Sequence, residues 1–203
     1  MRLTKEQAEA NRRRILAEAG QLFRARGFDG ISVAELMQAA GFTHGGFYNH
    51  FESKSDLMAE VTREVLAAAS AKLRDRTDPH RGPKPESFAD YVDTYLSLAA
   101  RDNPGRACPI STLSHEVARQ DGTIKRAFVQ GLRDYLDAFA AALPQAQDDP
   151  AAGRRQAIAT FAALIGGLVM ARAVAGEDEA FSQEILDSIG AIVKGSSCGA
   201  DGR

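Results

Sequence analysis

Residues Ser32-Val-Ala-Glu-Leu-Met-Gln-Ala-Ala-Gly-Phe-Thr-His-Gly-Gly-Phe-Tyr-Asn-His-Phe51 predict two short helices joined by a tight turn. Ser32 and Glu35 have the spacing of a capping box, which starts the first helix. Gly41 is suited to end it, because glycine readily adopts the left-handed conformation found after helix C-termini. Thr43 can cap the second helix. The segment is therefore typical of a helix-turn-helix.

The second predicted helix, residues 44–50, would be about 10 Å long, close to the width of about 12 Å of a B-DNA major groove. Phe47 and Phe51 lie four residues apart and are expected to face the core. The exposed sides then carry Thr43, His44, Gly45, Gly46, Tyr48, Asn49 and His50. Two glycines inside a helix cost about 1 kcal/mol each relative to alanine. Close approach to a phosphate or base edge would explain them; the alternative is a loosely wound first turn.

Four side chains on or beside this helix can hold a DNA phosphate. Thr43 combines a hydroxyl with free backbone N–H groups at a helix N-terminus, which is an anion-binding arrangement. Tyr48 offers a phenol and His50 an imidazole N–H. Lys54 opens the following helix after the predicted Ser53 cap, where its ammonium can reach the same strand. Any one of them alone would be an ordinary surface residue, but together they predict DNA binding.

In these motifs the chain resembles the tetracycline-repressor (TetR) family of bacterial transcriptional regulators. The resemblance covers about residues 11–60. The matching motifs are Arg12-Arg-Arg-Ile-Leu-Ala-Glu-Ala19, Gly27-Phe28, Ile31-Ser-Val33, Ala39-Ala-Gly41, Thr43, Phe47-Tyr-Asn-His-Phe51 and Lys54. It implies an all-α subunit with three N-terminal helices for DNA and a larger C-terminal domain for ligand binding and dimerisation.

The resemblance also implies roles for single residues. Positions matching Thr43, Tyr48, His50 and Lys54 would contact phosphates, and positions matching His44, Gly45, Gly46 and Asn49 would face the groove. We therefore expect a DNA-binding domain in residues 1–53, a ligand-binding and dimerisation domain in residues 54–194, and a flexible tail in residues 195–203.

Composition restricts the class of protein. The 203 residues are 44% hydrophobic, enough for a helical protein with a real core. No run approaches the roughly 18 apolar residues of a membrane span, and the N-terminus lacks the apolar region of a signal peptide. We therefore expect a cytoplasmic protein with no membrane partner. The two cysteines, Cys108 and Cys198, have no metal-ligand pattern around them, so neither a metal nor another cofactor is expected.

The net charge of −2 is unevenly distributed. Residues 1–51 hold seven basic and five acidic side chains, a net of +2, which leaves −4 for the rest. This asymmetry fits a small basic tip that binds nucleic acid through local contacts. Consecutive helical residues point in different directions, so at least one of Arg12, Arg13 and Arg14 is expected on a solvated face.

Apolar periodicity is helical along the whole chain. The first helix is expected from Lys5 to Arg26, with Thr4 and Gln7 as its cap pair, and a connecting helix from Lys54 to Arg76 that would transmit signals between domains. Prolines and glycine predict a turn over residues 78–85, and later loops are expected at 103–105, 120–122, 144–150 and 176. The other expected helices span residues 86–101, 108–119, 122–143, 153–175 and 179–194.

The last two predicted helices are unusually apolar. One subunit cannot easily cover both stripes, so we expect a homodimer through residues 153–175 and 179–194, with Gly166 and Gly167 permitting close helix approach. Its operator would be pseudo-palindromic, with half-sites about 34–36 Å apart or a multiple of that spacing. The alternative is a pair of buried core helices in a monomer.

Regulation is less evident from the sequence. The aromatic residues of the middle helices could line a cavity for a small apolar or aromatic effector, but such stripes are more often core. These residues are Tyr91, Tyr95, Phe128, Tyr135 and Phe139, and possible polar contacts are His115 and Arg172. Cys108 precedes Pro109 at a predicted helix start, which lowers a thiol pKa, so oxidation or alkylation of Cys108 is an alternative signal. A small buried hydrophobic residue is the plainer interpretation of Cys108.

We therefore predict a sequence-specific transcriptional repressor that binds double-stranded DNA and is released by a small molecule. Repression itself rests on the resemblance. An enzyme is not expected, because the four histidines are scattered and no nucleophile, acid and base converge. A helical scaffold for protein partners is also disfavoured, since it would leave the exposed glycine-rich face without a purpose.

Overall fold

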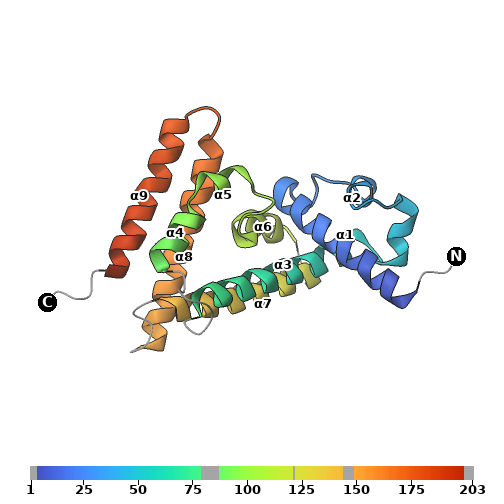
Figure 1. Ribbon diagram of the computed structural model, residues 1–203, viewed down its shortest axis with the longest axis horizontal. Helices are drawn as coiled ribbons and strands as arrows, with labels where there is room; N and C mark the ends of the chain where they lie inside the picture. The colour runs from blue at the N-terminus through green and yellow to red at the C-terminus, as the bar shows by residue number, and fades with distance from the viewer. Residues whose placement is uncertain (1–3, 79–86, 121, 144–148, 199–203) are drawn as a thin grey trace. The chain divides into compact units, whose positions relative to one another are not determined.

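The computed structural model describes residues 4–78, 87–120, 122–143 and 149–198, and helices account for the regular secondary structure of these ranges (Figure 1). The all-α prediction is confirmed. The elements are α1 Lys5–Arg26, α2 Val33–Ala39, the 3₁₀ helix η1 His44–Asn49, α3 Lys54–Thr77, α4 Phe88–Tyr95, α5 Leu98–Asp102, α6 Pro109–Ala118, α7 Gly122–Ala142, α8 Pro150–Val174 and α9 Glu179–Cys198.

The chain divides into two compact units. One contains residues 1–66 and 104–131, and the other contains residues 67–103 and 132–203, so α3 and α7 each contribute to both. These units follow packing rather than function, and the division into a DNA-binding domain 1–53 and a ligand-binding domain 54–194 stays a prediction.

The first unit is built from α1, α2, η1, α6 and the adjoining ends of α3 and α7. As predicted, Thr4 and Gln7 form a reciprocal capping box that starts α1, and Gly27 ends it with φ +75°. Phe23 and Phe28 pack edge to face at 5.3 Å between ring centroids. The core residues that are almost fully buried are Ile15, Ala19, Phe23, Phe28, Leu36, Met37, Phe47, Phe51, Leu57, Leu66, Ile110 and Leu113.

The second unit pairs α8 with α9 and packs α4 and α5 against them. A Cβ added to Gly167 would lie 2.9 Å from Cγ1 of Ile189 on α9, whereas one added to Gly166 would meet nothing within 4 Å. The predicted close helix approach is therefore made at Gly167 within one subunit, and Gly166 faces away from that contact.

Three predicted boundaries are wrong. The helix expected over residues 86–101 is broken at Leu96, because Ser97 caps a new helix by accepting a hydrogen bond from the Ala100 N–H at 3.1 Å. The helix expected from residue 153 begins at Pro150, with Asp149 as its side-chain cap. Helix α9 continues to Cys198, beyond the start of the tail expected at residue 195.

Some predicted segments lie outside the described residues. They include most of the turn over residues 78–85, most of the loop over 144–150 and the tail from residue 199.

Helix α8 is long and apolar enough to cross a membrane by length and composition alone. An 18-residue stretch of this helix has a mean hydropathy of 1.9 and is 33% buried. By length and composition, α8 therefore contradicts the expectation that no run approaches a membrane span. Core helices of soluble proteins pass the same test, and α8 packs along α9. We therefore interpret its apolar surface as a packing surface.

Candidate nucleic-acid interface

The turn between α2 and η1 has the predicted geometry. Ser32 and Glu35 form a reciprocal capping box, with the Glu35 N–H donating to Ser32 Oγ at 3.2 Å and the Ser32 N–H donating to the Glu35 carboxylate at 2.9 Å. The Ser32 hydroxyl holds the pKa of the Glu35 carboxyl below its ordinary value. Gly41 turns the chain with φ +80°, and the Phe42 N–H donates to the Met37 carbonyl at 2.8 Å. Each of these hydrogen bonds joins residues of the segment itself.

The second element is a 3₁₀ helix rather than the α-helix suggested by its spacing. The Gly46 N–H donates to the Thr43 carbonyl at 3.0 Å and the His50 N–H to the Phe47 carbonyl at 2.9 Å, both three residues apart. The predicted Thr43 side-chain cap is not formed, so the exposed hydroxyl is left to other partners. A 3₁₀ helix is wound more tightly than an α-helix, so this geometry does not support the alternative of a loosely wound first turn.

Two phenylalanines anchor η1 in the first unit. Phe47 and Phe51 are 1% and 2% exposed, as predicted, and their ring centroids lie 5.5 Å apart. Because this inner face is buried, the other side chains of η1 are turned outward. Thr43, His44, Gly45, Tyr48 and Asn49 are exposed, while Gly46 and His50 are half-buried.

Neither glycine of η1 is required by internal packing. A Cβ added to Gly45 would meet nothing within 4 Å, and one added to Gly46 would make ordinary contact with Met37 Cε at 3.7 Å. Neither has a positive φ. Tyr48 is 67% exposed and stands edge-on to His44 at 6.3 Å. The face is thus an exposed, nearly smooth patch flanked by aromatic and hydrogen-bonding side chains.

His50 directly follows η1, and Lys54 is the first residue of α3. Burial, and then the positive charge of Arg12, lowers the pKa of His50, which favours the neutral imidazole. Lys54 is half-buried, and its Nζ donates to the Ile31 carbonyl at 2.7 Å. The predicted Ser53 cap is present, since Ser53 Oγ accepts from the Asp56 N–H at 3.0 Å. Lys54 therefore ties α3 to the start of the helix-turn-helix, a role that the sequence did not reveal.

Glu116 is a further contact that sequence reasoning missed. It lies half-buried on α6, and its carboxylate accepts a hydrogen bond from the Phe28 N–H at 3.0 Å. A Cβ on Gly27 would lie 2.9 Å from the same carboxylate, so glycine is needed here both for its positive φ and for space. No local pattern could show this contact, because 88 residues separate the partners.

Most of the predicted effector residues are buried in one aromatic cluster of the second unit. Tyr91, Tyr95, Tyr135 and Phe139 pack with Phe88 and Phe161, and the hydroxyls of Tyr91 and Tyr135 lie 2.8 Å apart. Phe128 is buried in the first unit. His115 is exposed on α6, where its Nε2 lies 2.7 Å from an Arg119 nitrogen. The candidates therefore do not form one cluster, and their effector role stays a prediction.

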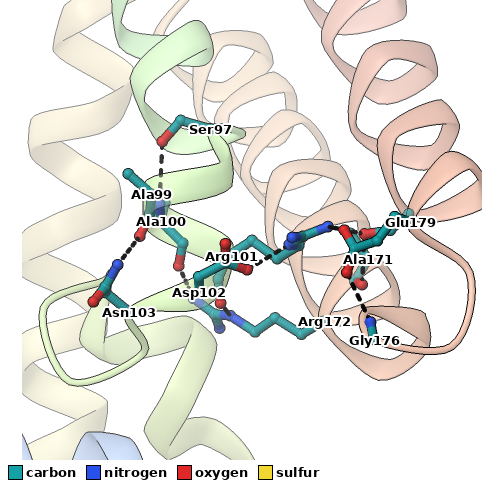
Figure 2. Close-up of polar contacts among 11 residues, drawn as sticks. Ser97, Ala99, Ala100, Arg101, Asp102, Asn103, Ala171, Arg172, Gly176 and Glu179 are labelled. Carbon is teal, nitrogen blue, oxygen red and sulfur yellow. Dashed lines mark hydrogen bonds and ion pairs between the residues drawn. The ribbon is translucent and has the colours of Figure 1, made fainter.

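Arg172 lies in a polar node of the second unit, where α5 meets α8 and the start of α9 (Figure 2). Its guanidinium donates to the carbonyls of Arg101 at 3.1 Å and Ala100 at 2.8 Å. Arg101, only 6% exposed, lies 2.6 Å from carboxylate oxygens of both Asp102 and Glu179.

The charges of this node stabilise one another. Hydrogen bonding to Arg101 lowers the pKa of Asp102, and the Gly176 N–H, followed by Arg101, lowers that of Glu179. Both shifts favour the folded state above the ordinary carboxyl pKa, and this contribution is lost as the pH falls through the lowered values. We interpret Arg172 as part of a structural junction.

Cys108 is the N-cap residue of α6. It is half-buried, Pro109 follows it at the first helical position, and its carbonyl accepts from Ser111 Oγ at 2.9 Å. Arg24 of α1 is close by: burial lowers the pKa of its guanidinium, and the sulfur of Cys108 opposes that shift. A helix N-terminus and a neighbouring guanidinium both favour a thiolate.

The comparisons with known proteins agree with this geometry. Residues 15–61 match the model of "Bacterial regulatory proteins, tetR family". The transcriptional regulator AcrR of Shigella flexneri is 43% identical over 60 residues, which is 30% of this chain and 28% of AcrR. The transcriptional repressor NemR of Escherichia coli is 24% identical over 147 residues, covering 72% of this chain and 74% of NemR.

Solved structures share the fold over nearly the whole chain. The reduced form of E. coli NemR aligns with a TM-score of 0.70 at 23% identity, covering 91% of this chain and 95% of NemR. A TetR regulator from Legionella pneumophila aligns with a TM-score of 0.73 at 18% identity, covering 97% of this chain and 99% of the other. These relatives regulate transcription and are not enzymes. Residues 15–61 therefore match the TetR family of bacterial transcriptional regulators, which are DNA-binding proteins with a helix-turn-helix, and the fold of the chain is that of solved members of this family.

Proposed function

We propose that the protein is a homodimeric repressor that reads a pseudo-palindromic operator through η1 and is released by a small-molecule effector. The observation that carries this proposal is the exposed face of η1, whose two glycines serve no internal packing. A surface without side chains, set between an exposed tyrosine and an exposed threonine, permits the closest approach to a base edge or a phosphate.

The proposed contacts divide by chemistry. Phosphates are held by the hydroxyls of Thr43 and Tyr48, the neutral imidazole of His50 and the ammonium of Lys54, which keeps two N–H groups beyond its bond to Ile31. Base edges are read by His44, Gly45, Gly46 and Asn49. Phosphate contacts position the protein and base contacts discriminate between sequences.

The proposed dimer is supported by an uncovered apolar surface in the second unit. Large apolar side chains of α8 and α9 are 44–66% exposed, namely Ile158, Val169, Met170, Phe181 and Ile192. Gly166 on α8 leaves room for a further helix. A second copy of the same two helices would cover this surface and form a four-helix interface. Two η1 elements would then face half-sites about one DNA turn apart, or a multiple of it.

Release requires an effector that prefers a dimer geometry unable to bind the operator. Bacillus subtilis FadR, a structural neighbour with a TM-score of 0.59, was solved with stearoyl-CoA. For this chain we propose an apolar or aromatic effector, with the second unit and α3 transmitting its effect. In the first unit, the hydrogen bond from Phe28 to Glu116 offers a second route, from α6 to α1. We place the protein in the cytoplasm, where operator DNA lies.

Selection of bound duplexes from a random library tests the proposal, because it yields the operator motif directly. Tyr48→Ala and Lys54→Ala are expected to weaken binding to all recovered sites alike. Lys54→Ala should also lower the slope of affinity against salt by about 0.9, since one phosphate is then no longer neutralised. Gly45→Ala is expected to leave thermal stability unchanged and to alter sequence preference, since its Cβ would fill space on the exposed face only. Failure of the native protein to bind any duplex in a salt-dependent way would contradict the proposal.

A second candidate function is regulation by oxidation or alkylation of Cys108. The position before α6 and the nearby Arg24 support it, as does the likeness to NemR, a structure of which is of the reduced form. Cys108→Ser is expected to bind the operator normally but to stay bound in the presence of an electrophile. Cys198→Ser is the matched control and is expected to respond as the native protein does. An unchanged response of the Cys108 variant would remove this hypothesis.

A further inference from the structure

The end of η1 is held by an arginine that lies outside the helix-turn-helix. Helix η1 is six residues long and carries no side-chain cap at its N-terminus. Helices of this type are short and have poorer hydrogen-bond geometry than α-helices, so their shape depends on the surroundings. The Phe51 N–H donates to the Phe47 carbonyl at 3.1 Å, which makes Phe51 the residue that closes η1 onto the core.

Arg12 of α1 contacts this closing residue directly. Its guanidinium carbon lies 4.4 Å from the centroid of the Phe51 ring, within cation–π distance. Its Nη2 lies 2.6 Å from the Glu60 carboxylate on α3, and the two side chains are 34% and 22% exposed. Its Nη1 is buried and has no hydrogen-bond acceptor in the described part of the chain. Arg12 thus connects α1, the end of η1 and α3.

A second arginine of α1 contacts the turn that precedes η1. The guanidinium carbon of Arg14 lies 5.6 Å from the ring centroid of Phe42, the residue two before η1 begins. A Cβ on Gly41 would lie 2.8 Å from a terminal nitrogen of Arg14. Arg13, between them, is exposed. The three arginines of the run Arg12-Arg-Arg14 therefore have different surroundings: Arg12 contacts Phe51, Arg14 contacts Phe42, and Arg13 is exposed.

We propose that Arg12 is a positioning residue for DNA reading: it holds Phe51 and α3 together so that η1 keeps the geometry in which its exposed face fits the groove. This inference rests on the proposed function of η1. Arg12 acts through Phe51 and Glu60 and makes no phosphate contact of its own. Its loss should therefore weaken operator binding without changing the number of phosphates that the protein neutralises.

The test compares full-length variants on the operator recovered by selection, with affinity measured over a series of salt concentrations. Arg12→Gln is expected to bind about tenfold more weakly, with the native slope of affinity against salt, because that slope reflects the number of phosphates neutralised. Arg12→Lys keeps the charge but loses the planar stacking group, and is expected to recover only part of the affinity. Arg13→Gln, the matched control for the loss of one positive charge, is expected to lose less affinity than Arg12→Gln.

Glu60→Gln changes the net charge in the opposite direction to Arg12→Gln, yet it is also expected to weaken binding. It makes the protein more positive, which by itself would tighten DNA binding, yet it removes the ion pair that orients Arg12. We expect weaker binding, by about threefold, with a circular-dichroism melt close to native, since partly exposed ion pairs contribute little to stability.

Three results would overturn the proposal: a slope reduced by about one in Arg12→Gln, native affinity in that variant, or tighter binding by Glu60→Gln. If Arg12→Gln does not fold, Arg12→Lys and Glu60→Gln decide. These results differ from the result expected if the proposed function itself is wrong, because the native protein would then bind no duplex.

Discussion

Phe181→Glu is expected to convert the dimer to a monomer and to weaken operator binding by about 10²–10⁴-fold, the usual gain from joining two binding modules. Phe181 lies on α9 and is 47% exposed. In a two-fold symmetric interface each substitution occurs twice, so one change places two carboxylates where an apolar partner surface is proposed. An unpaired charge is costly to bury, and the dimer would lose that free energy.

The monomer itself should tolerate the change. A glutamate in the first turn of α9 is favourable at a helix N-terminus, and the replaced ring is already half in solvent. Ala180→Glu is the matched control: it adds the same charge at an exposed neighbouring position about 100° around the helix. Sedimentation velocity and operator titration measure the two effects. A Phe181→Glu protein that remains dimeric would contradict the assignment of this face.

Phe161→Ala is expected to destabilise the second unit by about 3–5 kcal/mol, the usual cost of truncating a buried phenylalanine. Phe161 of α8 is 2% exposed. Its ring centroid lies 4.9 Å from that of Tyr135, 5.3 Å from that of Phe139 and 5.8 Å from that of Tyr95. Truncation leaves a void that these rings cannot fill without giving up their edge-on and tilted packing.

Urea unfolding followed by tyrosine fluorescence and circular dichroism measures this loss. Phe161→Leu, which keeps most of the volume, is the control and is expected to lose less than half as much stability. The result also bears on the effector. If the aromatic cluster were the wall of an open cavity, alanine would cost much less, because the side chain would have few atoms packed against it. A loss below about 1 kcal/mol would therefore favour the cavity over the core interpretation of these residues.

The helix break at Leu96 and Ser97 is a feature of the fold that the sequence prediction missed. The apolar spacing over residues 86–101 is helical throughout, and the pattern alone predicts one helix. The break arises because Ser97 caps a new helix by accepting a hydrogen bond from the Ala100 N–H. In addition, the Arg101 guanidinium donates hydrogen bonds to Glu179 and Ser182 on α9. The contact between Arg101 and Glu179 spans 78 residues of sequence, beyond the reach of any local rule.

The candidate site divides in the same way. Five of the seven residues expected on the exposed sides of η1 are exposed, and Gly46 and His50 are half-buried. The prediction succeeded this far because the alternation of buried phenylalanines with polar residues and glycines is local. It did not reveal that η1 is a 3₁₀ helix or that Lys54 bonds to Ile31, which is 23 residues away. Nor did it separate Arg12 from Arg13, since adjacent arginines look alike until the fold gives one of them a ring and a carboxylate.

The sequence by itself determined the helical class, the capping boxes at Thr4 and Ser32, the turns at Gly27 and Gly41, and which residues face outward on η1. All of these depend on hydrogen bonds and side-chain spacing within about four residues. Only the tertiary structure decided which charged side chains are partners: Arg12 with Glu60 and Phe51, Glu116 with Phe28, and Arg101 with Glu179. A charged side chain can pair with any opposite charge or aromatic ring close to it. Residues far apart in the sequence come close to one another only when the helices pack.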